Sequence, residues 1–249
     1  MITALAETFR KQLGPRNRRL ARSLVDPMLG FVGTAHGARK TSSSVALTFD
    51  DGPHPLVTPR LLDLLRERNA KSTFFMLTDH AVRHPALVRR VIDEGHEVGL
   101  HCDRHDRLTT LGFSEIKQRL AKARAVLEQL CGVPVKLFRP PYGAQSLVSF
   151  VAARSLGFEI VAWGPYAEDW IDQTAEASAA KVLGCVKGGD IALFHDGLEL
   201  AAGTPEPELD RVRVVELVLD GLAERSLDAT TVGRLLAEHG TRRTAWFRQ

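Results

Sequence analysis

The chain has 249 residues, of which 44% are hydrophobic and 25% are charged, and its formal net charge is +3. These values are ordinary for a soluble globular protein with a sizeable core, either one large α/β domain or two small ones. The arginines are spread along the whole length, whereas nucleic-acid binding needs a concentrated basic face. We therefore expect no nucleic-acid partner.

The cysteines and the hydropathy of the sequence bear on the cellular compartment of the protein. Cys102, Cys131 and Cys185 form no C-x-x-C pair, and an odd number does not suit a disulfide framework, so free thiols in a reducing compartment are expected. The first thirty residues lack the apolar core and cleavage site of a secretory signal. No window approaches the ~18 consecutive apolar residues of a membrane span. The expectation is a cytoplasmic protein without a transmembrane segment.

Residues 1–40 differ from the rest of the chain. Amphipathic helical segments are predicted near 3–13 and 17–29, and the stretch 33–44 ("GTAHGARKTSSS") reads as a linker. For these basic segments we favour a helical appendage packed on the main domain over peripheral contact with a membrane surface. The predicted division is a helical extension and linker at 1–40 and the main domain at 41–249.

From Val45 onward, strand-like and helical patterns alternate. The predicted strands are 45–50, 72–77, 96–101, 136–139, 158–163, 190–195 and 227–231. The predicted helices are 56–69, 84–94, 114–131, 146–156, 173–186 and 211–225. Such alternation indicates parallel strands and crossover helices, in an irregular or incompletely closed α/β barrel. No glycine-rich phosphate-binding loop follows any strand, which disfavours a nucleotide role.

Polar residues follow the predicted strands at the end where parallel barrels carry their functional groups. They are Asp50–Asp51, His101 with His105, Arg139, Trp163 with Asp169, and His195–Asp196. Two adjacent carboxylates are costly unless something nearby takes up their charge. Asp50 and Asp51 are therefore either an N-capping Asp in a solvated loop or a metal ligand beside a general base.

The string "HCDRH" supplies two imidazoles for the second possibility. His101 and His105 are four apart, so a helical turn would point both the same way, although such pairs often lie on solvated helix faces. With Asp51 they make a two-His, one-Asp set that leaves coordination positions open. Zn²⁺ suits these ligands best, and Co²⁺, Ni²⁺ or Fe²⁺ also fit.

Five strings, "TFDDGP", "HCDRH", "RPPYG", "DW" and "LFH", occur in one order over roughly residues 44–238. In this order and spacing the chain resembles polysaccharide deacetylases of the NodB-homology type, carbohydrate esterase family four. The resemblance implies an irregular (β/α)7–8 barrel of that type. It also implies a metal-dependent hydrolase that removes the N-acetyl group from an amino-sugar substrate, releasing acetate and a free amine. The expected partner is an N-acetylated sugar, oligosaccharide or glycoconjugate.

The resemblance also implies roles for individual residues. Asp50 matches the catalytic base, and Asp51, His101 and His105 match the ligands of one divalent ion whose water attacks the amide. His195 matches the acid that protonates the departing amine.

Five further residues match supporting positions of the family pattern. Arg139 matches the residue that holds the base, and Asp169 the one that orients the acid and would raise its pKa. The backbone N–H of Tyr142 matches the oxyanion donor. Trp170 and Leu193 match the lining of the acetyl-methyl pocket, although a place in the core would explain both equally well.

Some positions depart from the family pattern. Cys102 stands where Ser or Thr is usual, Leu100 where Asn is common, and Tyr166 where an acidic residue is common. A Pro- and Glu-rich insert at 197–211 follows His195 and could border the groove. These departures predict an intact catalytic set with an altered sugar-recognising surface.

Two alternatives stay open at this point. One is hydrolysis of a non-sugar linear or cyclic amide on the same barrel, and the other is a non-catalytic carbohydrate-binding protein. The complete set of ligands, base and acid argues against both.

Overall fold

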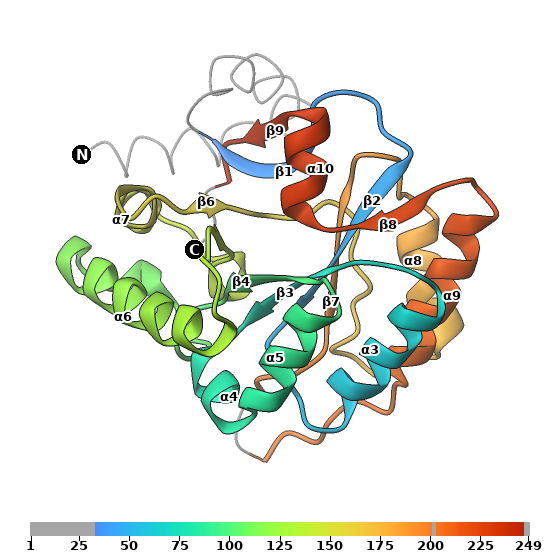
Figure 1. Cartoon of the computed structure of the whole chain (residues 1–249), viewed down its shortest axis with the longest axis horizontal. Coiled ribbons are helices and arrows are strands. Elements are labelled where there is room, and N and C mark those ends of the chain that lie inside the picture. The colour runs from blue at the N-terminus through green and yellow to red at the C-terminus, as the bar shows by residue number, and fades with distance from the viewer. Residues whose placement is uncertain (1–32, 201–202, 247–249) are drawn as a thin grey trace, which may run out of the picture.

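The computed structural model describes residues 33–200 and 203–246, so the helical segments predicted at 3–13 and 17–29 lie outside the described residues. A curled parallel sheet in the strand order β6-β5-β4-β3-β2-β7, with β8 also beside β2, forms the centre (Figure 1). Its strands are β2 (Ser44–Asp50), β3 (Thr73–Met76), β4 (Glu97–Leu100), β5 (Leu137–Phe138), β6 (Glu159–Ile160), β7 (Ile191–His195) and β8 (Asp228–Thr230).

Strand β2 pairs with three other strands of the sheet. Its residues after Ser44 are all buried, because β3 and β8 pair with it on one side and β7 on the other. A parallel strand covered on both faces needs a continuous apolar run, which "VALTF" supplies. The register places Asp50, at the carboxyl end, level with His195 of β7.

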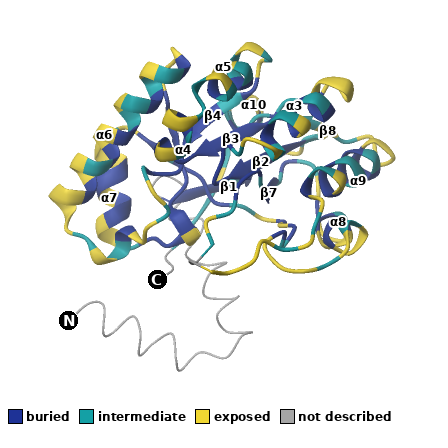
Figure 2. Ribbon diagram, turned by 90° about the horizontal axis from the view of Figure 1, so that it is seen from below, coloured by how far each residue is buried: buried dark blue, intermediate teal, exposed yellow. Residues whose placement is uncertain are grey.

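Helices cover the sheet and turn their apolar faces inward. Figure 2 shows buried strands at the centre and exposed residues on the outer faces of the helices. The helices are α3 (Val57–Glu67), α4 (Thr78–Arg83), α5 (Pro85–Asp93), α6 (Phe113–Cys131), α7 (Leu147–Ser155), α8 (Ala175–Leu183), α9 (Arg211–Ala223) and α10 (Val232–His239), with single 3₁₀ turns η1 (Leu108–Thr110) and η2 (Pro141–Gly143).

A second sheet of two antiparallel strands, β1 (Thr34–Ala38) and β9 (Thr241–Thr244), connects the two edges of the large sheet. The amide of Ala162, just after β6, donates to Ala35 at 2.7 Å, and the amide of Ala38 donates to Gly189, just before β7, at 2.6 Å. Strand β1 therefore bridges the gap that β6 and β7 leave open. The predicted irregular α/β barrel is confirmed.

The prediction was wrong at both ends of the main domain. The stretch 33–44 reads as a linker, but it contains β1, and neither α10 nor β9 was predicted after 231. Strands β1 and β9 pair across about two hundred residues, for example Thr34 with Thr244. A local sequence pattern carries no signal for such a pairing.

The helix predicted at 84–94 is confirmed as α5, and a short helix that was not predicted, α4, lies directly before it. Helix α4 starts at Thr78 and ends at Arg83, and α5 starts at Pro85. Proline disfavours helical geometry in the residue before it and is well tolerated as the first residue of a helix. His84 accordingly leaves the helical region, with φ −129° and ψ 55°.

The strands predicted at 136–139 and 158–163 are also too long. Only Leu137–Phe138 and Glu159–Ile160 form strands. Pro140 and Pro141 follow the first of them, and proline has no N–H to donate to a ladder.

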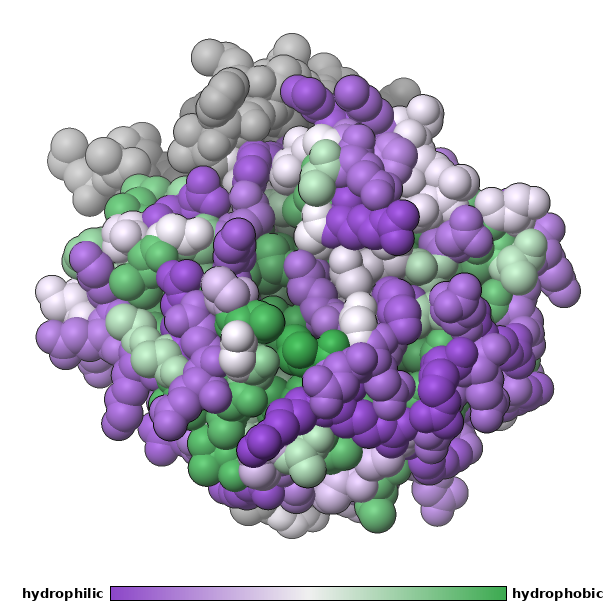
Figure 3. Space-filling model, in the orientation of Figure 1, coloured by the Kyte–Doolittle hydropathy of each residue, from purple (hydrophilic) through white to green (hydrophobic). Residues whose placement is uncertain are grey.

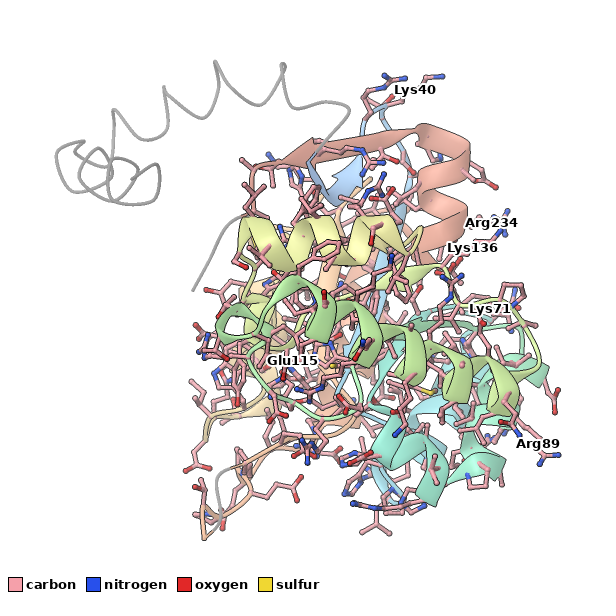
Figure 4. The ribbon with its side chains drawn as sticks, turned by 90° about the vertical axis from the view of Figure 1, so that its left-hand side faces the viewer. Lys40, Lys71, Arg89, Glu115, Lys136 and Arg234 are labelled. Atoms are coloured by element: carbon pink, nitrogen blue, oxygen red, sulfur yellow. The ribbon has the colours of Figure 1, made fainter. Side chains whose placement is uncertain are left out.

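The surface is mostly polar. Hydrophilic residues dominate the face in Figure 3, and the hydrophobic ones gather toward its middle and lower left. Figure 4 labels six charged side chains, Lys40, Lys71, Arg89, Glu115, Lys136 and Arg234, of which all but Glu115 lie along the upper and right-hand edges of that view. Among the residues described, no helix combines the length and the apolar character that a membrane crossing requires.

Candidate active site

Three side chains from two strand ends meet beside the carboxyl end of β2. The Nε2 atoms of His101 and His105 lie 3.3 Å and 3.4 Å from the same oxygen, Oδ1 of Asp51. One ligand atom from each of the three residues lies within 4.8 Å of the other two. The structure therefore brings together the three residues that the sequence predicts as metal ligands.

The loop that carries both imidazoles is not helical. Residues 103–105 form bends and their neighbours at 101–102 and 106–107 have no regular structure, while Cys102 has φ 82°, a left-handed conformation that is unfavourable for a side chain with a Cβ. The two imidazoles therefore meet without the helical turn that would have pointed them the same way. The amide of Thr78, at the start of α4, donates to Cys102 O at 3.1 Å, and that of Asp79 donates to Asp103 O at 3.1 Å.

The chemistry of the three side chains fits a divalent cation. Asp51 Oδ1 is buried and has no hydrogen-bond partner among the described residues. His101 Nδ1 lies 2.8 Å from the carbonyl oxygen of Arg139, so Nδ1 carries the proton and leaves the Nε2 lone pair free. Burial, together with the proximity of His101, lowers the pKa of His105 to about 4, which keeps that ring in the neutral form that binds metals.

The carboxylate of the triad is ionised. Burial alone would raise the pKa of Asp51, but the proximity of His101, and then of His195 and His105, holds it well below its usual range. Asp51 has φ 69°, so this residue too is held in a left-handed conformation. Non-glycine residues in such conformations persist only where the surrounding structure imposes them, and they concentrate at functional sites.

Arg139 holds the second carboxylate, Asp50. Its Nη1 donates to Asp50 Oδ1 at 2.7 Å and to Thr48 Oγ1 at 2.8 Å. The guanidinium has no solvent exposure and lies 4.2 Å from the ring centre of Phe75 and 5.6 Å from that of Trp163. Asp50 Oδ2 is 3.9 Å from His101 Nε2, so this carboxylate lies next to the triad without belonging to it.

His195 and Asp169 form a second charged pair. His195 Nδ1 lies 2.8 Å from Asp169 Oδ1, and the His195 amide donates to Asp169 Oδ2 at 2.8 Å. Burial alone would lower the pKa of His195, but Asp169, helped by Asp51 and Asp50, raises it to about 9. The imidazole can therefore carry a proton on the side of the site opposite His101 and His105.

Two exposed aromatic residues flank the site. The ring of Tyr142 packs 4.1 Å from that of His105, centre to centre, and its backbone is left-handed with φ 58°. Trp170 meets the ring of His195 edge-on at 5.4 Å. Leu193 is only 3% exposed, so burial does not separate its predicted role from that of a core residue.

Known proteins are similar to this chain in sequence and in fold. A family model described as polysaccharide deacetylase matches residues 37–161. The chain belongs to the polysaccharide deacetylase family. A peptidoglycan-N-acetylglucosamine deacetylase of Listeria monocytogenes is 38% identical over 175 residues, which are 70% of this chain and 37% of that protein. The chain thus spans little more than a third of the length of that relative.

Two further relatives match over most of their length. A chitooligosaccharide deacetylase of Azorhizobium caulinodans is 34% identical over 170 residues, 68% of this chain and 81% of that protein. A crystallised peptidoglycan N-acetylglucosamine deacetylase in complex with 4-naphthalen-1-yl-N-oxidanyl-benzamide has a TM-score of 0.75 and 30% identity, and the match covers 86% of this chain and 95% of that one.

The sequence analysis missed two residues, His80 and Glu199, that contact Asp51 of the triad. His80 Nδ1 lies 3.0 Å from the carbonyl oxygen of Asp51, and its Nε2 lies 2.7 Å from Glu199 Oε1. The Glu199 amide in turn donates to Asp51 Oδ2 at 3.4 Å. The insert at 197–211 signalled Glu199, whereas His80 lies on α4, which the sequence pattern did not predict.

The expectation for Asp196 changes as well. It follows His195 at the predicted rim, but its Oδ2 accepts a 2.5 Å hydrogen bond from Thr58 Oγ1, and the residue is fully buried. Burial raises the pKa of Asp196 to about 7. Asp196 therefore connects the start of α3 to the end of β7.

Proposed function

We propose that this protein is a metal-dependent hydrolase that removes an N-acetyl group from an amino-sugar substrate and releases acetate and a free amine. The observation that supports it best is the buried Asp51 oxygen that has no hydrogen-bond partner and faces two imidazole nitrogens. A cation is the group that such a donor set lacks. Two of the relatives are named peptidoglycan-N-acetylglucosamine deacetylase and chitooligosaccharide deacetylase, and these names support the proposed substrate class.

Asp51, His101 and His105 would hold one divalent ion, for which we propose Zn²⁺ because nitrogen and carboxylate ligands suit it. When bound, the ion would polarise the acetamide carbonyl and lower the pKa of the attacking water. The roles of base and acid then fall to residues outside the triad.

Asp50 is the proposed base. Its Oδ1 is held by Arg139, while Oδ2 lies 3.9 Å from His101 and faces the site, so the carboxylate is oriented and can take a proton from water. His195 is the proposed acid, since Asp169 orients its ring and favours its protonated form. The proton from His195 goes to the amine nitrogen as the C–N bond breaks.

The remaining proposed roles concern the acetyl group. The backbone N–H of Tyr142 would donate to the carbonyl oxygen as negative charge develops there. Trp170 and Leu193 would contact the methyl group, since Trp170 lies against His195 and Leu193 lies two residues before it in β7.

Mass spectrometry of an N-acetylglucosamine oligomer series, with added Zn²⁺ and with chelator, tests the proposal. The expected result is metal-dependent loss of acetyl groups with stoichiometric acetate, and no loss with Asp50→Asn. If no oligomer loses an acetyl group when metal is present, the proposed function is wrong.

A further inference from the structure

The turn η2, which carries the proposed oxyanion donor, has an unfavourable backbone conformation. Tyr142 has φ 58° and Gly143 has φ 60°. Two hydrogen bonds close the turn from within, since the amides of Gly143 and Ala144 donate to Pro140 O at 2.9 Å and to Pro141 O at 3.0 Å. A left-handed non-glycine residue persists only where the surrounding structure imposes it. The contacts between this turn and other segments therefore decide where the Tyr142 amide points.

Trp246, two residues after β9, makes such a contact. Its indole Nε1 donates to Gly143 O at 3.0 Å. The Trp246 ring lies 5.1 Å from that of Trp163, centre to centre. A Cβ on Gly143 would lie 2.6 Å from the Trp163 ring and 3.4 Å from Trp246 Nε1, so the backbone of the turn packs directly on both indoles. The turn is thus attached to the segment that follows β9.

The main chain of Trp246 is fixed to the same stretch. Gln145, which is buried, donates from Nε2 to Trp246 O at 2.6 Å and to Thr34 Oγ1 at 2.9 Å. Thr34 lies in β1, opposite Thr244 of β9. The indole and the carbonyl oxygen of Trp246 therefore both bond to residues 143–145, and the pairing of β1 with β9 holds this arrangement in register.

Trp163 connects this contact to the proposed base. Its ring centre lies 5.6 Å from the guanidinium carbon of Arg139, which donates to Asp50 Oδ1 at 2.7 Å. Trp246 therefore lies behind two parts of the proposed machinery, the oxyanion donor and the base. It also lies outside residues 37–161, which the family model matches, so the family match gives it no role.

We propose that Trp246 is a positioning residue for the deacetylation, because it fixes the turn so that the Tyr142 N–H points to where negative charge develops. The inference rests on the proposed function and adds a residue to it. An oxyanion donor acts in the transition state, once charge has moved onto the carbonyl oxygen. Loosening the turn should therefore lower kcat and leave KM nearly unchanged.

The first experiment measures kcat and KM for an N-acetylglucosamine tetramer with added Zn²⁺. Trp246→Phe keeps a ring beside Trp163 and removes the N–H, so kcat should fall about tenfold while KM stays within about twofold, since small displacements of an oriented group are costly. Trp246→Ala also loses the ring contact and should lower kcat further. The proposal is overturned if either variant keeps the kcat of the original chain, or if the loss appears in KM instead.

The matched control for these variants is Arg242→Ala. It removes the 2.9 Å ion pair between β9 and Asp190, which precedes β7, and leaves the bond from Trp246 to the turn in place. Its kcat should equal that of the original chain. A tenfold loss of kcat in Arg242→Ala would mean that any weakening of β9 slows turnover, and the specific role of Trp246 would be refuted.

A second experiment needs no turnover. Hydrogen exchange of the Gly143 and Ala144 amides, followed by NMR in the presence of chelator, reports the opening of the turn. Trp246→Phe should accelerate it about fivefold, the factor for one lost hydrogen bond, and Gln145→Met should act in the same direction. Amides of β2 should exchange at the original rate. Unchanged exchange in the turn, or an equal acceleration in β2, contradicts the positioning role.

The two experiments separate this proposal from the proposed function. If exchange in the turn accelerates in Trp246→Phe but the original chain releases no acetate from any oligomer, Trp246 holds the turn and the deacetylase proposal fails. If acetate is released and Trp246→Ala releases it at the original rate, the positioning proposal fails alone.

Discussion

Arg139 donates a 2.7 Å hydrogen bond to Asp50 from a position without solvent exposure, and its own carbonyl oxygen lies 2.8 Å from His101 Nδ1. One residue thus orients both the proposed base and a proposed metal ligand. A buried charge that loses its partner is strongly destabilising, since burial removes the water that would otherwise solvate it.

Arg139→Met should therefore lower the free energy of unfolding by about 3–5 kcal/mol, measured by urea denaturation, because it leaves Asp50 buried without a cation. In the double variant Asp50→Asn/Arg139→Met the loss should be smaller, since no carboxylate is left uncompensated. If both variants lose the same free energy of unfolding, the loss comes from the packing of the Arg139 side chain rather than from its charge.

Metal content should separate the ligands from the base. His101→Ala removes one of three ligand atoms, so elemental analysis of the purified variant should find little bound metal. Asp50→Asn should keep its metal and lose about 10²–10⁴-fold in kcat, the usual contribution of a positioned general base. A normal kcat in Asp50→Asn would refute the base assignment.

The contact between Asp169 and His195 predicts that the pKa of His195 depends on Asp169. Asp169 raises the pKa of His195, which is about 9 without metal, so Asp169→Asn should lower it. Imidazole resonances followed by NMR against pH, in the presence of chelator, give the pKa directly. The kcat of Asp169→Asn should fall as well, because less of the acid is protonated at neutral pH. If the His195 resonance titrates at the same pH in both proteins, Asp169 does not control its protonation.

His80 is expected to position the metal ligand Asp51, because it contacts the Asp51 carbonyl oxygen and Glu199. Substituting a residue that orients a metal ligand typically lowers metal affinity by about 10–100-fold. His80→Ala should weaken Zn²⁺ binding by that amount in competition with a fluorescent chelator. His84→Ala, one turn further along at the end of α4, is the matched control. Indistinguishable affinities in the two variants would mean that His80 does not position the ligand.

His96 should make the fold sensitive to acid. Burial lowers its pKa to about 4, and its Nδ1 accepts the Ser72 amide at 3.2 Å. The unfolded chain, with the ordinary value of about 6.5, therefore binds a proton that the folded chain excludes. The stability cost is absent above about pH 6.5 and grows to about 3 kcal/mol as pH falls to 4.

Urea denaturation at several pH values measures this slope. His96→Asn keeps an acceptor for the Ser72 amide and removes the titrating ring, so stability should fall less steeply between pH 6.5 and 4 than in the original chain. His239→Asn, at the partly exposed end of α10, should leave the slope unchanged. The explanation fails if the slope is the same with and without the His96 ring.

Much of the site could be predicted from local sequence. Apolar runs that end in Asp50–Asp51, His101 and His195 indicate buried parallel strands, and the carboxyl ends of such strands meet at one rim. The structure brings these residues together, and Asp50 is level with His195 in adjacent strands. The four-residue spacing of His101 and His105 could not predict how their rings converge, since the loop between them is not helical.

The sequence by itself determined the class of barrel and the residue types of the proposed metal ligands, because strand periodicity and residue chemistry are local properties. Tertiary structure alone decided that β1 closes the gap between β6 and β7, that His80 supports Asp51, and that Trp246 bonds to the turn that carries Tyr142. Those contacts join segments far apart in the chain, and their partners are chosen by the packing of the whole fold rather than by any neighbouring residue.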